Sequence, residues 1–193
     1  MEKTLVIEHS SLTMRRVAAV FLGAVLVAAA AQVSVPLPGT PVPMTLQPMA
    51  VLLVGGLLGA PLGAWSMLLY LAMCATGLPV FTPTVPLVGV ARLFGPTGGY
   101  LLAYPVAAWV VGRFSDPGLA PGVSEPWFRV AFGVLVGLVL IHLGGLAQLA
   151  ILTGNVSAAA RFGTLPFMLG DLLKIAVLVP ILTKLGPTIR ARL

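Results

Sequence analysis

Two oppositely charged side chains stand inside an apolar stretch near the end of the sequence. Asp171 and Lys174 lie within the run 165–182 and are three positions apart, which places both on one face of a helix. By insertion scales each costs about 2.5 to 3.5 kcal/mol at the centre of a membrane helix, so we expect them to face each other, a cavity or a ligand. They fit either a binding site for a polar organic ligand or a purely structural ion pair on an inner helix turn.

Two further polar side chains lie in mainly apolar company. Arg92 is the only basic residue between 77 and 99, and a guanidinium in such surroundings requires a carboxylate or carbonyl partner. The alternative is an interfacial arginine that extends to lipid phosphate. Gln47 opens the second apolar run, where its amide can donate to and accept from a ligand, or simply face water at a helix end.

No pattern of a catalytic or metal site occurs in the sequence. His142 and Gln148 are six positions apart, which is not one helical turn, so they form no metal pair, and we expect a hydrogen bond between helices instead. The glycine-rich run 95–100 lacks the lysine of a phosphate-binding loop, and GxxxxGK[ST], HExxH and GxSxG are all missing. We therefore expect no catalytic residue, no metal and no cofactor, so that any ATP must be used by partner subunits.

The composition places these residues in a membrane protein. Hydrophobic residues make up 59% of the chain and charged residues only 8%, whereas a soluble domain has about 25% charged residues. A membrane span takes about 20 apolar residues, so 193 residues have room for about six short spans and for no separate extramembrane domain. The net charge of +6 comes from basic residues that stand singly between apolar runs, which indicates membrane topology rather than a nucleic-acid site. We predict one all-α membrane domain over residues 1–193.

Apolar runs bounded by proline, glycine or charge predict the helices that position the polar residues. Pro61 between the second and third runs predicts a tight hairpin; an arrangement of five spans follows if this hairpin re-enters the membrane instead. The long apolar connection 77–99 and its outer neighbours are expected to fold back as a lid over a cavity near the outer face. The six predicted spans are 15–34, 46–59, 62–78, 98–113, 129–152 and 166–186.

The distribution of basic residues predicts the orientation of the chain. Eight of them fall on the side of the termini and two on the opposite side, and basic residues in short loops stay in the cytoplasm. We therefore predict cytoplasmic N and C termini. The larger set is Lys3, Arg15, Arg16, Arg113, Arg129, Lys184, Arg190 and Arg192, and the smaller set is Arg92 and Arg161.

Small residues recur at helical spacing in the first predicted span. Ala19 and Gly23 are four positions apart, as are Ala24 and Ala28. Such pairs allow two helices to approach closely. The face they form either packs inside this chain or docks against a partner membrane protein.

Four ordered motifs resemble the BioY family, the biotin-specific S components of energy-coupling factor (ECF) vitamin transporters. The similarity runs over nearly the whole chain, but residues 82–86 are rich in proline where the family usually has a glycine-rich stretch. The motifs are the segment 31–47, then Gly77-Leu78-Pro79-Val80-Phe81, then Gly95-Pro96-Thr97-Gly98-Gly99-Tyr100, and finally Pro166-Phe167 with Gly170-Asp171-Leu172-Leu173-Lys174.

This resemblance implies a fold and a function. It implies a six-helix bundle in the inner membrane of a prokaryotic cell, surrounded by lipid, with biotin as transported substrate held near the outer face. It also implies a coupling subunit and two ATPases as partners, and from the small-residue spacing we predict that they dock against that face of the first span. Alternatives are a solitary biotin transporter and a carrier of another small heterocyclic acid. The substrate-binding residues that we predict are Gln47, Phe81, Arg92, Tyr100, Asp171 and Lys174.

Overall fold

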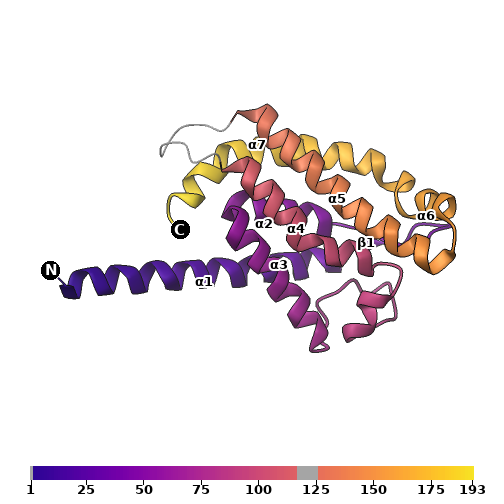
Figure 1. The fold of residues 1–193 in the computed structure, drawn as a ribbon, viewed down its shortest axis with the longest axis horizontal. Helices are drawn as coiled ribbons and strands as arrows, with labels where there is room; N and C mark the ends of the chain where they lie inside the picture. The colour runs from indigo at the N-terminus through magenta and orange to yellow at the C-terminus, as the bar shows by residue number, and fades with distance from the viewer. Residues whose placement is uncertain (1, 117–125) are drawn as a thin grey trace.

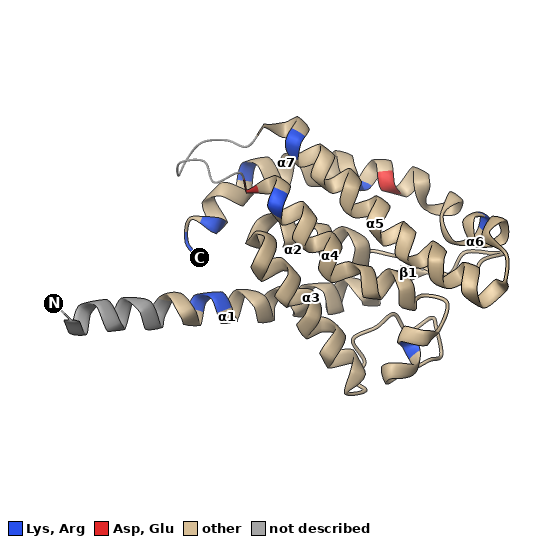
Figure 2. Cartoon of the chain, viewed as in Figure 1, with Lys and Arg blue, Asp and Glu red and all other residues tan. Residues whose placement is uncertain are grey.

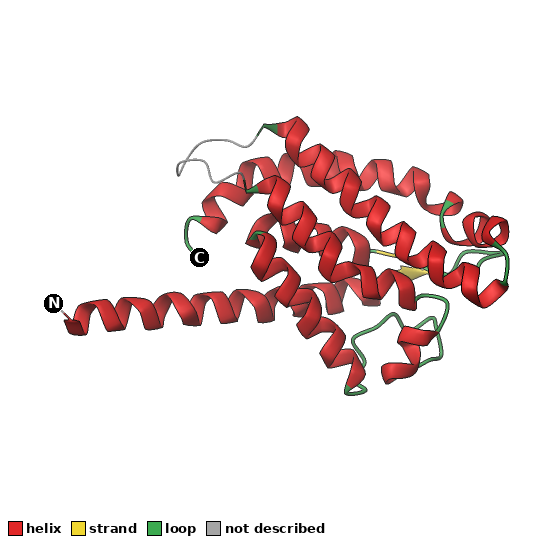
Figure 3. Ribbon diagram, viewed as in Figure 1, coloured by secondary structure: helices red, strands yellow, loops and turns green. Residues whose placement is uncertain are grey.

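The computed structural model describes the backbone of residues 2–116 and 126–193, and within these ranges the side chains from residue 12 onward. The described chain is mostly helical, with one short strand pair in the half of the bundle away from the termini (Figure 3). The α-helices are α1 (Glu2–Gln32), α2 (Gln47–Leu58), α3 (Ala60–Ala75), α4 (Gly98–Ser115), α5 (Trp127–Thr153), α6 (Val156–Gly163) and α7 (Met168–Arg190). The 3-10 helices are η1 (Gly89–Phe94) and η2 (Leu165–Phe167), and the antiparallel strands are β1 (Ser34–Val35) and β2 (Met44–Thr45).

Six of these helices coincide with the six predicted spans and pack side by side (Figure 1). Three segments, 12–32, 127–153 and 156–190, are each long and apolar enough to cross a membrane. Two boundaries differ from the prediction. The first helix begins at Glu2 rather than near residue 15, and the connection 152–165 contains α6, which begins where the Asn155 side chain accepts a hydrogen bond from the Ala158 amide at 3.1 Å.

The predicted hairpin between the second and third spans is confirmed, and its turn is a single glycine. Gly59 separates α2 from α3 with φ of +84°, a backbone conformation that favours glycine. Pro61 lies in the first turn of α3, where its missing N–H costs no helical hydrogen bond. The hairpin reaches the end of the bundle where α7 finishes, because the Arg190 guanidinium donates to the Gly56 carbonyl. The hairpin therefore does not turn back part-way along the bundle. The arrangement is the predicted one of six helices and not the alternative of five spans.

Both termini, the end of α4 and the start of α5 lie at one end of the bundle (Figure 1). Most basic residues gather at this end (Figure 2). Arg16 of α1 donates a hydrogen bond to the carbonyl of Leu193 at 2.6 Å, which joins the two terminal segments. The strand pair, η1 and α6 lie at the opposite end. Lys3, which we expect on the side of the termini, falls outside the residues whose side chains are described.

The small-residue face of α1 packs largely inside the chain. Gly23 is buried against Ser66 of α3 and Val54 of α2, and Ala24 is completely buried in the core. Internal packing is therefore the role that the structure gives these two residues, and the expectation that they form a docking surface for a partner is wrong. Ala19 and Ala28 of the same face are half-buried.

Candidate ligand-binding pocket

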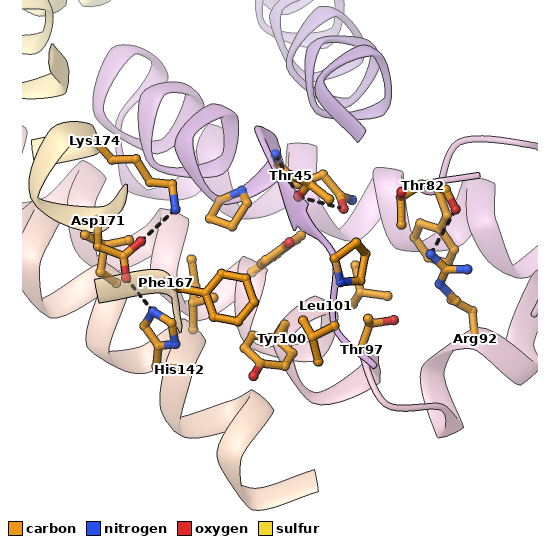
Figure 4. Close-up of a pocket in the computed structure, with 18 residues that line it drawn as sticks. Thr45, Thr82, Arg92, Thr97, Tyr100, Leu101, His142, Phe167, Asp171 and Lys174 are labelled. Carbon is orange, nitrogen blue, oxygen red and sulfur yellow. Dashed lines mark hydrogen bonds and ion pairs between the residues drawn. The ribbon is translucent and has the colours of Figure 1, made fainter. Parts of the chain in front are cut away.

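A pocket lies inside the half of the bundle that carries the strand pair and η1, enclosed by four helices and by the connections that fold over them (Figure 4). The lid predicted from the apolar connections is thus present. The pocket is lined from β2 and its approach by Val42, Pro43 and Thr45, from α2 by Gln47 and Pro48, from the connection 76–97 by Phe81, Thr82, Arg92 and Thr97, from α4 by Tyr100, Leu101 and Tyr104, from α5 by Leu138, Ile141 and His142, and from η2 and α7 by Phe167, Asp171 and Lys174.

One end of the pocket carries three linked polar side chains. Lys174 donates a hydrogen bond to Oδ1 of Asp171 at 2.6 Å, and Nε2 of His142 lies 2.6 Å from Oδ2 of the same carboxylate. Asp171 and Lys174 are each about nine-tenths buried, at 9% exposure. The predicted pairing of these two residues on one helix face is confirmed, and both point into the pocket.

The sequence did not predict that His142 belongs to this site. The expected hydrogen bond between helices is indeed made, from α5 to α7, but its partner is the carboxylate of the predicted ligand site. The two donors hold Asp171 from both sides, so the plane of its carboxylate is fixed. A carboxylate has about four acceptor positions, and each of its oxygens can therefore still accept a hydrogen bond from a ligand.

The other end of the pocket is organised by Arg92, which is 1% exposed. Its guanidinium donates to the carbonyls of Thr82 at 3.0 Å, Val85 at 2.5 Å and Leu87 at 3.2 Å. The alternative of an arginine extended to lipid phosphate is wrong, because the side chain is buried and its partners are carbonyls of its own loop. Burial also lowers the pKa of the Arg92 guanidinium from its ordinary value.

These hydrogen bonds shape the proline-rich segment in which the sequence departs from the family that it resembles. Arg92 holds three carbonyls of residues 82–87, and its guanidinium carbon lies 5.4 Å from the centre of the Phe81 ring. A loop with several prolines has few N–H groups to bond with itself. The arginine supplies the donors that fold it back over the helices, and it thereby brings Phe81 and Thr82 to the pocket.

Between its two ends, the wall of the pocket is formed by aromatic rings and by a side-chain amide. Gln47 is 4% exposed, donates from its amide to the hydroxyl of Tyr70, and accepts from the Thr45 hydroxyl at 3.4 Å. The alternative in which Gln47 faces water is therefore wrong. Tyr100 turns its hydroxyl away to the Gly163 carbonyl and leaves its ring against the pocket.

The arrangement suits a small organic molecule that is apolar in the middle and polar at both ends. Figure 4 shows Asp171, Lys174 and His142 at one end, Arg92 and Thr82 at the other, and Phe167, Tyr100 and Leu101 between them. All six predicted substrate-binding residues line this one pocket.

Comparison with known proteins gives matches over almost the entire chain. The model of the BioY family matches residues 2–191. A probable biotin transporter BioY of Pyrococcus horikoshii is 36% identical over 171 residues, which cover 89% of this chain and 96% of that protein. A biotin transporter BioY of Thermotoga maritima is 35% identical and covers 79% of this chain and 84% of its own length. A solved structure, the S-component for biotin from an ECF-type ABC transporter, superposes with a TM-score of 0.79 at 27% identity, over 90% of this chain and 91% of that one.

Proposed function

The chain belongs to the BioY family, and from this membership we propose that it captures biotin in the described pocket and delivers it across the membrane. The observation that carries the proposal is the buried Asp171–Lys174 pair, with His142 behind it, at one end of a cavity whose middle is lined mainly by apolar side chains. Charged groups in a membrane protein are costly and usually mark a substrate site. We further propose that the pocket opens toward the outside of the inner membrane and that both termini are cytoplasmic, which the division of basic residues supports.

We propose that Asp171 accepts a hydrogen bond from a ureido N–H of biotin. Both oxygens of its carboxylate are held by other donors and retain free acceptor positions, so the group is oriented before the ligand arrives. Lys174 and Arg92 then neutralise the biotin carboxylate or hold the ureido carbonyl. They stand at opposite ends of the pocket (Figure 4), which suits an elongated ligand with polar groups at both ends.

The middle of the pocket accommodates the apolar part of biotin in this proposal. The rings of Phe81 and Tyr100 provide apolar surface, and the amide of Gln47 provides polar atoms between the two charged ends. The chain has no phosphate-binding loop in its sequence, so we propose that energy for transport comes from a coupling subunit and ATPases of the ECF type. The solved S-component that this fold resembles comes from such a transporter.

Calorimetric titration of the purified chain in detergent tests the substrate. We expect saturable binding of one biotin per chain, and a ligand at 100 times its dissociation constant stabilises the fold by about 2.7 kcal/mol. Thermal unfolding with a panel of vitamins is the matched control. Stronger stabilisation by another heterocyclic acid would identify a different substrate, and stabilisation by none of them would contradict the proposal.

Biotin uptake into cells tests the partners. The chain is expressed alone and together with a coupling subunit and ATPases in a host that lacks its own biotin transport. We expect uptake that depends on the ATPases. Equal uptake by the chain alone would identify a solitary transporter with the same substrate.

A further inference from the structure

At the end of the pocket away from Asp171, two polar atoms have no hydrogen-bond partner within the described part of the chain. They are Oγ1 of Thr97 and Nε of Arg92, and both are inaccessible to solvent. Thr97 is 8% exposed and Arg92 is 1% exposed. Both residues line the pocket at the end away from Asp171 (Figure 4). Buried polar groups are nearly always bonded, so two unbonded ones at one end of a cavity call for an explanation.

The local structure gives the Thr97 hydroxyl no role in holding the fold. Thr97 is the N-cap residue of α4, a position where threonine ordinarily accepts a hydrogen bond from an amide of the first turn. Here the side chain makes no such bond. The helix start is instead held by backbone bonds, among them the bond from the Gly98 amide to the Gly95 carbonyl at 3.0 Å. The hydroxyl is therefore free to serve another group.

The same reasoning applies to the neighbouring guanidinium. The terminal nitrogens of Arg92 are occupied by three loop carbonyls, which fixes the group and leaves Nε–H unused. A hydroxyl and an Nε–H can both donate. Two donors on one wall are complementary to an acceptor oxygen. Biotin offers such oxygens in its ureido carbonyl and in its carboxylate.

We propose that Thr97 is a ligand-binding residue whose hydroxyl donates a hydrogen bond to an oxygen of bound biotin, beside the Nε–H of Arg92. The inference rests on the proposed biotin function and adds a residue that the motif analysis did not single out as a contact.

The variants Thr97→Val and Thr97→Ser test the proposal. Valine has nearly the same shape and lacks the hydroxyl, so we expect biotin to bind about 5- to 50-fold more weakly. The thermal midpoint of the ligand-free variant should equal or exceed that of the parent, because valine removes an unbonded buried polar group. Serine keeps the hydroxyl and should bind biotin within about threefold of the parent, a difference of about 0.65 kcal/mol at most.

The parent protein is titrated in the same experiment, which separates this inference from the proposed function. If the parent does not bind biotin, the function itself is wrong. If the parent binds and Thr97→Val binds within threefold of it, the role of Thr97 is wrong. A ligand-free Thr97→Val protein that unfolds at a clearly lower temperature than Thr97→Ser would show a structural bond of the hydroxyl and would equally overturn the inference.

Two analogues identify the oxygen. One is 2-iminobiotin, which replaces the ureido carbonyl oxygen with nitrogen, and the other is a biotin in which a methyl group replaces the carboxylate. The penalty of Thr97→Val should disappear with the analogue that lacks the oxygen bonded to Thr97. A penalty that persists unchanged with both analogues would contradict a hydrogen bond to either oxygen.

Discussion

Replacing Asp171 with asparagine is expected to weaken biotin binding while leaving the shape of the pocket almost unchanged. The carboxylate accepts from Lys174 and from His142 at 2.6 Å each. An asparagine has one carbonyl oxygen and one donating amide. Its oxygen can still accept from Lys174 and its amide can face the ring of His142, so the internal contacts are partly kept. What is lost is the negative charge that receives the ligand.

The size of the effect follows from that loss. A hydrogen bond to a charged group contributes about 1.5 to 3 kcal/mol, and 1.4 kcal/mol is tenfold in affinity. We therefore expect the dissociation constant for biotin to rise roughly 10- to 100-fold. The thermal midpoint should also fall, because Lys174 is nine-tenths buried and loses its only described counter-ion.

A double variant decides between a ligand role and a purely structural ion pair. In Asp171→Asn with Lys174→Met both charges are gone, which relieves the cost of burying them. Calorimetry with the folded double variant in detergent is the measurement, and near-UV circular dichroism confirms that it is folded. A direct role for the pair predicts that affinity stays low. An affinity within about threefold of the parent would falsify it.

Three further predictions concern the support of the site and its orientation. His142→Leu should weaken biotin binding about two- to tenfold, because the Asp171 carboxylate loses one of the groups that hold it, and His142→Gln should partly restore the affinity. Calorimetry measures both affinities, and an unchanged affinity in both variants would contradict this prediction. Gly145→Ala should lower the thermal midpoint, because the added methyl group would collide with the ring of Tyr100. Gly170→Ala should not, because its methyl group would meet only the Met44 side chain at 3.7 Å, an ordinary van der Waals contact. A cysteine placed by Arg192→Cys should not react with an impermeant reagent added to intact cells; labelling there would refute cytoplasmic termini.

The helices could be predicted from the sequence because apolar runs and their proline and glycine boundaries directly reflect the membrane. The ends of the helices could not be predicted as well. Hydropathy marks where a segment is apolar, whereas backbone hydrogen bonding continues through polar residues beyond it, as in α1, which begins at Glu2. The eight residues of α6 are too few and too polar to register as an apolar run, and they owe their start to the cap at Asn155.

The small-residue pattern in α1 shows a second limit of sequence reasoning. Glycine and alanine at a spacing of four indicate that something packs closely, but they do not say what. In this chain Gly23 and Ala24 are covered by α2 and α3. The choice between an internal and an external neighbour depends on which way α1 is rotated, and that is set by the packing of the whole bundle.

The site was partly predictable for the same kind of reason. Asp171 and Lys174 share a helix turn, so their pairing follows from spacing alone. His142 is 29 positions away from its partner, and its role depends on how α5 faces α7. The hydroxyl of Thr97 is visible in the sequence, but its lack of a partner is a property of the folded loop.

The balance of charge in the pocket links these observations to the kind of ligand that fits. Lys174 is neutralised by Asp171, whereas the described partners of Arg92 are neutral carbonyls. The pocket therefore holds one uncompensated positive charge when His142 is neutral. In a medium of low dielectric constant, opposite charges attract over several ångströms, so a ligand need not touch the terminal nitrogens of Arg92 to benefit. A ligand with a single carboxylate brings the pocket to neutrality, which favours a monocarboxylic acid such as biotin over its neutral esters.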